Sequence, residues 1–275
     1  MIDLSPMRGV RIDPENRIAH VSGGALLGDV DHAAGAFDLA LPVGILSTTG
    51  IGGLTLGGGI GNMTRTLGLT IDNLLEVDVV LASGRLVKTN DKEHEDLFWA
   101  VRGGGGNFGV ATHFTFRLHP MQTVVFGPTL WHMDDAVDVL RFYREYLPAA
   151  PDGVNGIFAF LTVPPVAPFP EDLHLKKMAA IVWCYAGDVD KAEEAFKPAL
   201  GVGKPALHGV MTVPVAAMNS AFDALYPPGT QQYWRADFFD SIPDQAVELN
   251  VEHGWKMPTL QCTTHMLPVD ARLDA

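Results

Sequence analysis

The sequence predicts an α+β fold with two domains, and three observations support this prediction. Two glycine-rich patches, Gly50 to Gly61 and Gly103 to Gly109, each lie beside a strand-like segment. Beyond His119-Pro120 glycine becomes sparse, and amphipathic segments with helical spacing alternate with apolar, strand-like runs. The 275 residues, 47% of them hydrophobic, suffice for two moderate domains. We therefore expect a first domain at residues 1–119 and a second, with an antiparallel sheet, at residues 120–275.

The first domain is expected to begin with two strands in GVRIDPENRIAHVSGG, joined by a turn at Asp13–Asn16, because Asp-Pro starts turns. LLGDVDHAAGAFDLAL has the apolar spacing of a helix. LLEVDVVLASGRLVKTN alternates apolar and polar residues around Ser83-Gly84, which predicts a hairpin. EHEDLFWAVRGG predicts a short helix that ends at glycine, and VATHFTFRLHP predicts a half-buried strand.

The second domain is expected to alternate helices and strands. MDDAVDVLRFYREYLPAAP and DVDKAEEAFKPAL have helical spacing, whereas GVNGIFAFLTVPP and KMAAIVWCYAG are apolar runs of strand length. Cys184 lies in the second of these runs, and neither it nor Cys262 has a metal or redox spacing. We expect two unpaired structural cysteines and no metal site.

Charge and hydropathy exclude several classes of partner. The net charge is -13, from 32 acidic and 19 basic residues, which disfavours nucleic acids and anionic membrane surfaces. No run of 18 apolar residues predicts a membrane span. The N-terminal residues lack the pattern of a signal peptide, which favours a cytoplasmic over a secreted location. The partner expected is a small-molecule substrate, and the oligomeric state is left open.

The glycine patches need a physical explanation. Glycine permits positive φ, lets two backbones pack closely, and lets a ligand approach exposed N–H groups. The chain contains no GxxxxGK[ST] phosphate loop. Gly104, Gly106 and Gly109 match GxGxxG, but they follow a predicted helix and precede a predicted strand, the reverse of the nicotinamide-binding context. That match is a chance one and argues against a nicotinamide enzyme.

LSTTGIGGLTLGGGIGNMTRTLGLTIDNLLEVDVVLASGRLV, followed by HEDLFWAVRGGGGNFGVATHFTFRLHP, resembles the FAD-binding domain of the berberine-bridge-enzyme-like FAD-linked oxidases. These belong to the vanillyl-alcohol-oxidase family with a PCMH-type FAD-binding fold. QQYWRADFF and LPVDARLDA resemble pieces of the substrate domain, so the resemblance spans nearly the whole chain. It implies FAD as cofactor. It implies these flavin-lining residues: Ser47, Thr48, Thr49, Gly50, Gly52, Gly53, Gly57, Gly58, Gly105, Asn107, Phe108, Gly109 and Val110.

Several positions depart from the family pattern. Many members tether FAD to a cysteine of the glycine loop, but Leu46 stands at that position, so no thioether can form there. The family's upstream Gly-Gly-His loop and its terminal Tyr-x-Asn segment have no counterpart, so we expect both domains to be incomplete and FAD binding to be weak. No catalytic residue is assigned; Tyr226, Tyr233 and His265 are conceivable groups. For Asp72 and Asn73 a local turn and a cofactor contact are both open.

The resemblance implies an FAD-dependent oxidoreductase. Hydride would pass from a small organic substrate, an alcohol, a sugar or an activated C–H compound, to the flavin, and oxygen is the expected oxidant of the reduced cofactor. Oxidase and dehydrogenase activity are both open. The alternative is a truncated remnant or binding module that keeps the fold without holding FAD.

Overall fold

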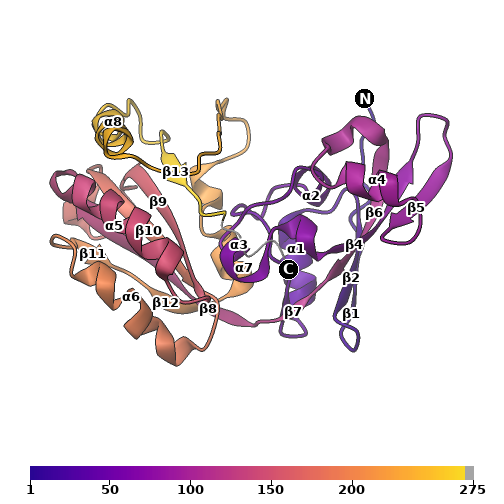
Figure 1. Ribbon diagram of the computed structural model, residues 1–275, viewed down its shortest axis with the longest axis horizontal. Helices are drawn as coiled ribbons and strands as arrows, with labels where there is room; N and C mark the ends of the chain where they lie inside the picture. The colour runs from indigo at the N-terminus through magenta and orange to yellow at the C-terminus, as the bar shows by residue number, and fades with distance from the viewer. Residues whose placement is uncertain (270–275) are drawn as a thin grey trace. The chain divides into compact units, whose positions relative to one another are not determined.

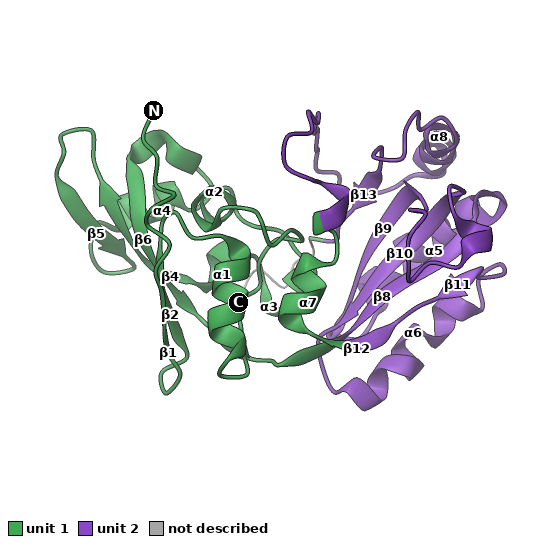
Figure 2. Ribbon diagram, turned by 180° about the vertical axis from the view of Figure 1, so that it is seen from behind, with its two compact units in different colours: residues 1–124, 213–223, 269–275 green, residues 125–212, 224–268 purple. Residues whose placement is uncertain are grey.

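The computed structural model describes residues 1–269, so the last six residues of LPVDARLDA lie outside the described part. The chain forms two compact units (Figure 2). The first contains Met1–Val124 and Val213–Asp223, and the second contains Val125–Thr212 and Ala224–Pro268. The chain therefore returns to the first unit after building most of the second. The division into domains at residues 119 and 120 stays a prediction.

The first unit is built on a five-stranded antiparallel sheet (Figure 1). Its order is β1-β2-β6-β4-β5, so the late strand β6 lies between two hairpins. The strands are β1 (Val10–Asp13), β2 (Ile18–Ser22), β4 (Leu74–Val80), β5 (Leu86–Asn90) and β6 (Val110–Arg117). Both predicted hairpins are present, and the Asp13 carboxylate holds the first turn by accepting the Asn16 backbone N–H at 3.1 Å.

Short helices accompany this sheet. They are α1 (Leu27–Gly35), α2 (Ile51–Leu56), α3 (Thr64–Leu67), α4 (Glu95–Val101) and α7 (Val215–Ser220), with 3-10 turns η1 (Thr70–Asn73) and η2 (Gly105–Phe108). A two-residue ladder pairs β3 (Leu39–Ala40) with β7 (His119–Pro120). The apolar faces of sheet and helices meet in a core that contains Leu27, Val30, Val77, Phe114 and Phe116. Helix α2, inside the first glycine patch, was not predicted.

The second unit has a six-stranded sheet in the order β11-β8-β10-β9-β13, with β12 also paired to β8. Its described pairings are antiparallel, as predicted. The strands are β8 (Thr123–His132), β9 (Val154–Thr162), β10 (Lys177–Tyr185), β11 (Leu207–His208), β12 (Met211–Pro214) and β13 (Thr264–Met266). The principal helices are α5 (Ala136–Ala149), α6 (Ala192–Leu200) and α8 (Asp244–Trp255).

The core of the second unit is aromatic. Trp131, Trp183, Phe158 and Phe160 are almost fully buried there, and the Phe158 and Phe160 rings meet edge to face with centroids 5.0 Å apart. Helices α5 and α6 contribute their apolar sides to this core, which confirms their predicted amphipathic character. Within the described residues, no helix is both long and apolar enough to span a bilayer.

Candidate functional site

The first glycine segment forms a loop that enters α2. Residues 47–49 run beside the start of α1, where the Leu27 and Gly28 backbone N–H groups donate to the carbonyls of Thr49 and Ser47, both at 2.9 Å. Gly50 then takes an extended conformation and caps α2. These hydrogen bonds fix the loop against α1.

Part of this segment has an open face. A Cβ placed on Gly50 or Gly53 would meet no atom within 4 Å. In the described part of the chain, the backbone N–H groups of Gly50, Gly52 and Gly53 find no acceptor, because they precede the first intrahelical hydrogen bonds of α2. A Cβ on Gly52 would lie 3.1 Å from the Gly23 carbonyl oxygen, so a side chain there would crowd the loop. The segment therefore offers bare donors to a ligand with acceptor atoms.

Other glycines of the same patch serve packing. Gly58 and Gly59 have φ of +112° and +83°, which glycine adopts without strain. A Cβ on Gly61 would lie 1.7 Å from the Val43 carbonyl oxygen, so only glycine lets these two backbones approach. Gly57, by contrast, closes α2 with a Cβ position at ordinary contact distance from Gly53. The patch therefore combines ligand-facing and packing glycines.

The second patch turns the chain from α4 into β6, as the sequence predicts. Gly105 has φ of +67° and an open Cβ position, and the Asn107 amide holds the turn by donating to the Gly104 carbonyl at 2.8 Å. Gly109, with φ of +151°, has a Cβ position 2.6 Å from the Val80 carbonyl oxygen. Val110 then pairs with Val80 in the sheet, while Phe108 is 41% exposed.

The structure brings the two patches together. The backbone N–H of Gly103 donates to the Leu56 carbonyl at 3.2 Å, and α2 contacts η2. Arg102 also reaches Asp72, with 3.8 Å between guanidinium and carboxylate. Two segments that the sequence separates by some forty residues thus lie side by side, and each carries glycines with open Cβ positions; we call this pair of segments the glycine surface.

Buried polar atoms near this surface lack partners. The Thr55 hydroxyl and both polar atoms of the Asn62 side chain are buried without a hydrogen bond among the described residues. Unpaired buried polar atoms are costly, and they commonly mark a missing ligand, water or segment. Together with the bare N–H groups, they fit a large bound group rich in hydrogen-bonding atoms, such as a dinucleotide cofactor.

Asp223 is a site residue that sequence reasoning missed. Its carboxylate accepts hydrogen bonds from the Ser47 backbone N–H, at 2.9 Å, and from the Ser47 hydroxyl. The two residues are separated by 176 positions. No local pattern around Asp223 could have revealed this contact, since it depends on the return of the chain to the first unit.

Asp72 and Asn73 have local structural roles. The Asp72 carboxylate caps η1 by accepting the Leu69 N–H at 2.8 Å. The buried Asn73 amide donates to the Leu67 and Leu69 carbonyls, and its oxygen lies 2.6 Å from His119 Nε2. Burial lowers the pKa of His119, and the nearby positive charges of two arginines lower it further. These contacts occupy the Asn73 side chain within the protein.

The remaining candidates belong to the second unit. The Tyr226 hydroxyl lies 3.3 Å from the Thr263 hydroxyl, beside the strand that carries His265. Burial lowers the pKa of His265, which favours its neutral form. Tyr233 is 88% exposed. None of the three makes a contact in this unit that assigns it a catalytic role.

The two cysteines are unpaired, as the sequence analysis expects, whereas the inference about Leu46 stays a prediction. Both cysteines are free, and burial in β10 raises the pKa of the Cys184 thiol far above its ordinary value, which keeps it unreactive. Leu46 precedes the site loop and offers no nucleophile. The described residues contain no cluster of three or more metal-ligating side chains.

Comparison with known proteins identifies the kind of site. Residues 1–90 match the family of the FAD binding domain. An FAD-linked oxidoreductase of Dictyostelium discoideum is 30% identical over 270 residues, which are 97% of this chain and 57% of that protein. An FAD-linked oxidoreductase of Aspergillus terreus is 36% identical over 219 residues, which are 77% of this chain and 42% of that protein. The chain thus spans only about half of the length of these relatives.

Solved structures show the same similarity. The 6-hydroxy-D-nicotine oxidase of Arthrobacter nicotinovorans superposes with a TM-score of 0.71 at 27% identity, over 83% of this chain and 49% of that one. A BBE-like protein of Arabidopsis thaliana gives 0.70 at 27% identity, over 84% and 46%. The expected fold and family resemblance are therefore confirmed, and FAD is the cofactor of this family of domains.

Proposed function

We propose, from its similarity to the berberine-bridge-like FAD-linked oxidoreductases, that this chain supplies part of the FAD site of a flavin-dependent oxidoreductase. The bound flavin would supply the redox chemistry by accepting a hydride from a small organic substrate, an alcohol, a sugar or an activated C–H compound, with oxygen as final acceptor. The chain's own residues bind and orient the cofactor.

The meeting of the two glycine patches carries this proposal. Because Gly103 is hydrogen bonded to Leu56, the two segments that carry the open positions at Gly50, Gly53 and Gly105 lie next to each other. Bare N–H groups on such a surface can donate to pyrophosphate or flavin carbonyl oxygens at distances that side chains would prevent.

Two groups of residues would contact the cofactor, one from each glycine segment. The first segment would hold the cofactor through the backbone of Ser47, Thr48, Thr49, Gly50, Gly52 and Gly53, with Gly57 and Gly58 shaping the turn behind it. The second would approach through Gly105, Asn107, Phe108, Gly109 and Val110. Asp223 holds the first segment in place, and the unpaired Thr55 and Asn62 side chains supply further hydrogen-bonding atoms.

A titration with FAD tests the proposal. The purified chain is titrated up to millimolar FAD while flavin fluorescence and melting temperature are followed, because a ligand that binds only the native state raises the melting temperature. Gly53→Glu adds a bulky anion at a position where the Cβ atom meets no other atom within 4 Å. We expect it to abolish FAD binding without lowering the apo melting temperature.

Gly201→Glu, at the exposed end of α6 in the second unit, is the matched control and should bind FAD like the parent chain. Equal FAD affinity for both variants would show that the glycine surface is not the site. A parent chain that binds no FAD at all would favour the alternative, a remnant that keeps the fold without the cofactor.

A further inference from the structure

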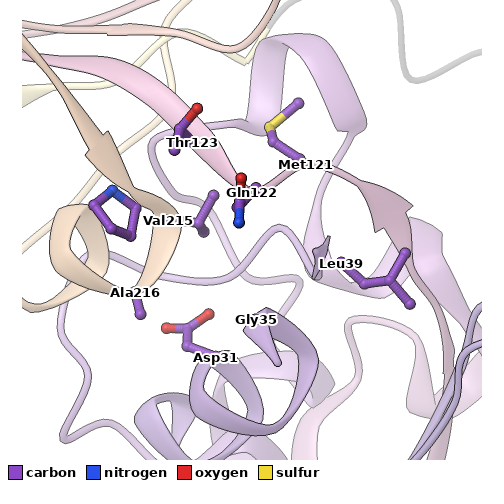
Figure 3. A pocket seen from close by; sticks show the side chains of 9 residues that line it. Asp31, Gly35, Leu39, Met121, Gln122, Thr123, Val215 and Ala216 are labelled. Carbon is purple, nitrogen blue, oxygen red and sulfur yellow. The ribbon is translucent and has the colours of Figure 1, made fainter. Parts of the chain in front are cut away.

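The first unit contains a pocket whose lining residues differ from those of the glycine surface. It has a volume of about 320 Å³, within the lower range of small-molecule sites. Its walls come from α1, β3, the segment between β7 and β8 with the first residue of β8, the last residue of β12, and the start of α7. Figure 3 shows Asp31 reaching in from α1 and Gln122 from the segment before β8. None of the flavin-lining residues named above contributes to it.

The pocket is apolar apart from a few groups. Leu39 and Val215 are buried in its wall, and Met121 adds a flexible apolar side chain. Gln122 and Thr123 are the polar side chains beside Asp31. Such a cavity suits a small ligand with an apolar body and one polar head.

Asp31 is the unusual group in this pocket. The residue is 5% exposed, and among residues 1–269 its carboxylate accepts hydrogen bonds from the Asn219 amide of α7 alone, at 3.1 and 3.2 Å. No cationic side chain faces it among the described residues. Burying a carboxylate without a counter-charge is costly, and a carboxylate at the wall of a cavity, with lone pairs left over, is a typical ligand-binding group.

A second group points to the same conclusion. Asn219 is fully buried, and with its amide nitrogen donating to Asp31 its oxygen has no donor among the described residues. The Asp31–Asn219 pair can therefore accept more hydrogen bonds than the described residues donate to it, and of the two residues it is Asp31 that lines the pocket. A ligand that brings N–H donors and a positive charge would complement it.

We propose that this pocket is a binding site for a small organic ammonium ion, whose charged nitrogen is held by the Asp31 carboxylate and whose short apolar body lies against Leu39, Met121 and Val215. A metal ion fits less well, because one carboxylate with apolar walls offers too few oxygen ligands. The site is independent of the flavin proposal, since it needs neither cofactor nor substrate turnover.

The charge state of the site follows from its surroundings. Burial raises the pKa of Asp31 to about 7, and the Asn219 hydrogen bonds oppose that rise. No other pocket-lining residue ionises; on α1, Asp29 is paired with Arg8 at 2.7 Å and His32 is exposed. An alkylammonium must displace the proton of the neutral form, so its affinity should fall about tenfold between pH 8 and pH 6.

The test compares n-butylammonium with n-butanol, which has the same apolar body but no charge. Binding to the purified chain is measured by NMR titration at pH 8. We expect millimolar affinity for the ammonium and at least about tenfold weaker binding of the alcohol, as the loss of a charge-assisted hydrogen bond implies. Equal binding of the two probes, or no binding of the ammonium, would overturn the proposal.

Two substitutions test whether the ammonium ion binds at Asp31. Asp31→Asn keeps the shape of the side chain and its contact with Asn219 but removes the charge. It should weaken the binding of n-butylammonium by about 10- to 100-fold. Asp91→Asn removes a charge from the exposed surface of the same unit and should change nothing. If Asp31→Asn does not fold, proton release during ammonium binding to the parent chain at pH 6 provides the same information. Binding without proton release would assign the ammonium to another site.

Discussion

The Asp223 carboxylate accepts two hydrogen bonds from Ser47, one from its backbone N–H at 2.9 Å and one from its hydroxyl. Asp223 stands at the end of the segment that returns to the first unit, and Ser47 opens the glycine loop. The carboxylate thereby fixes the loop that we propose to carry the cofactor. Preorganisation of this kind lowers the ordering cost of binding.

Asp223→Ala should loosen the glycine loop. Hydrogen exchange of the residues 47–50 amides is expected to accelerate, and FAD affinity to fall by about tenfold, because a hydrogen bond to a charged group contributes roughly 1.5–3 kcal/mol. Ser47→Ala removes only the hydroxyl contact and should give an intermediate effect. Asp237→Asn, at an exposed position of the second unit, is the control. Unchanged exchange in Asp223→Ala would show that α1 alone holds the loop.

Asp31 should make stability pH-dependent. Its pKa is about 7 in the folded protein and about 4 in an unfolded chain, so the native state holds the extra proton between these values. The free energy of unfolding therefore falls as pH rises from about 4 to 7, by at most about 4 kcal/mol from this group, and is level above that. In Asp31→Asn this fall should be absent, as urea unfolding at several pH values would show. An unchanged pH profile in the variant would contradict a buried, protonated Asp31.

The glycines should respond to alanine in opposite ways. Gly61→Ala would place a Cβ 1.7 Å from the Val43 carbonyl, so we expect it to cost about 1–3 kcal/mol or more. Gly53→Ala, inside α2 and with open space at its Cβ position, should stabilise the apo chain by about 0.4–1 kcal/mol. Chemical unfolding of both variants measures the difference. Equal costs would refute the division into packing and ligand-facing glycines.

Leu46 should carry no flavin. Its side chain has no nucleophile, so peptides that contain it should show the unmodified mass after incubation with FAD. Leu46→Cys restores a thiol at that position and is the matched comparison for adduct formation. A flavin adduct on a Leu46 peptide of the parent chain would mean that the family's motif is placed wrongly on this sequence.

The sequence correctly predicted those elements whose structure depends on residues close together along the chain. The hairpin around Ser83-Gly84, the amphipathic helix α5 and the buried strand of Cys184 are all present, because turn chemistry and apolar periodicity act over a few positions. Helix α2 was missed because six of the ten residues from Gly50 to Gly59 are glycines, which disfavour helices in isolation. Packing against the rest of the unit outweighs that preference.

By itself, then, the sequence determined the α+β class, the strand order within each hairpin, the absence of a thiol at Leu46 and the family to which the glycine motifs point. Only the tertiary structure decided which glycines face open space and which face a neighbouring backbone. It also decided the partners of Ser47 and Asp31, which lie 176 and 188 positions away along the chain. Local preferences cannot specify such pairs, because they form only when the returning segment packs against the first unit and removes both partners from water.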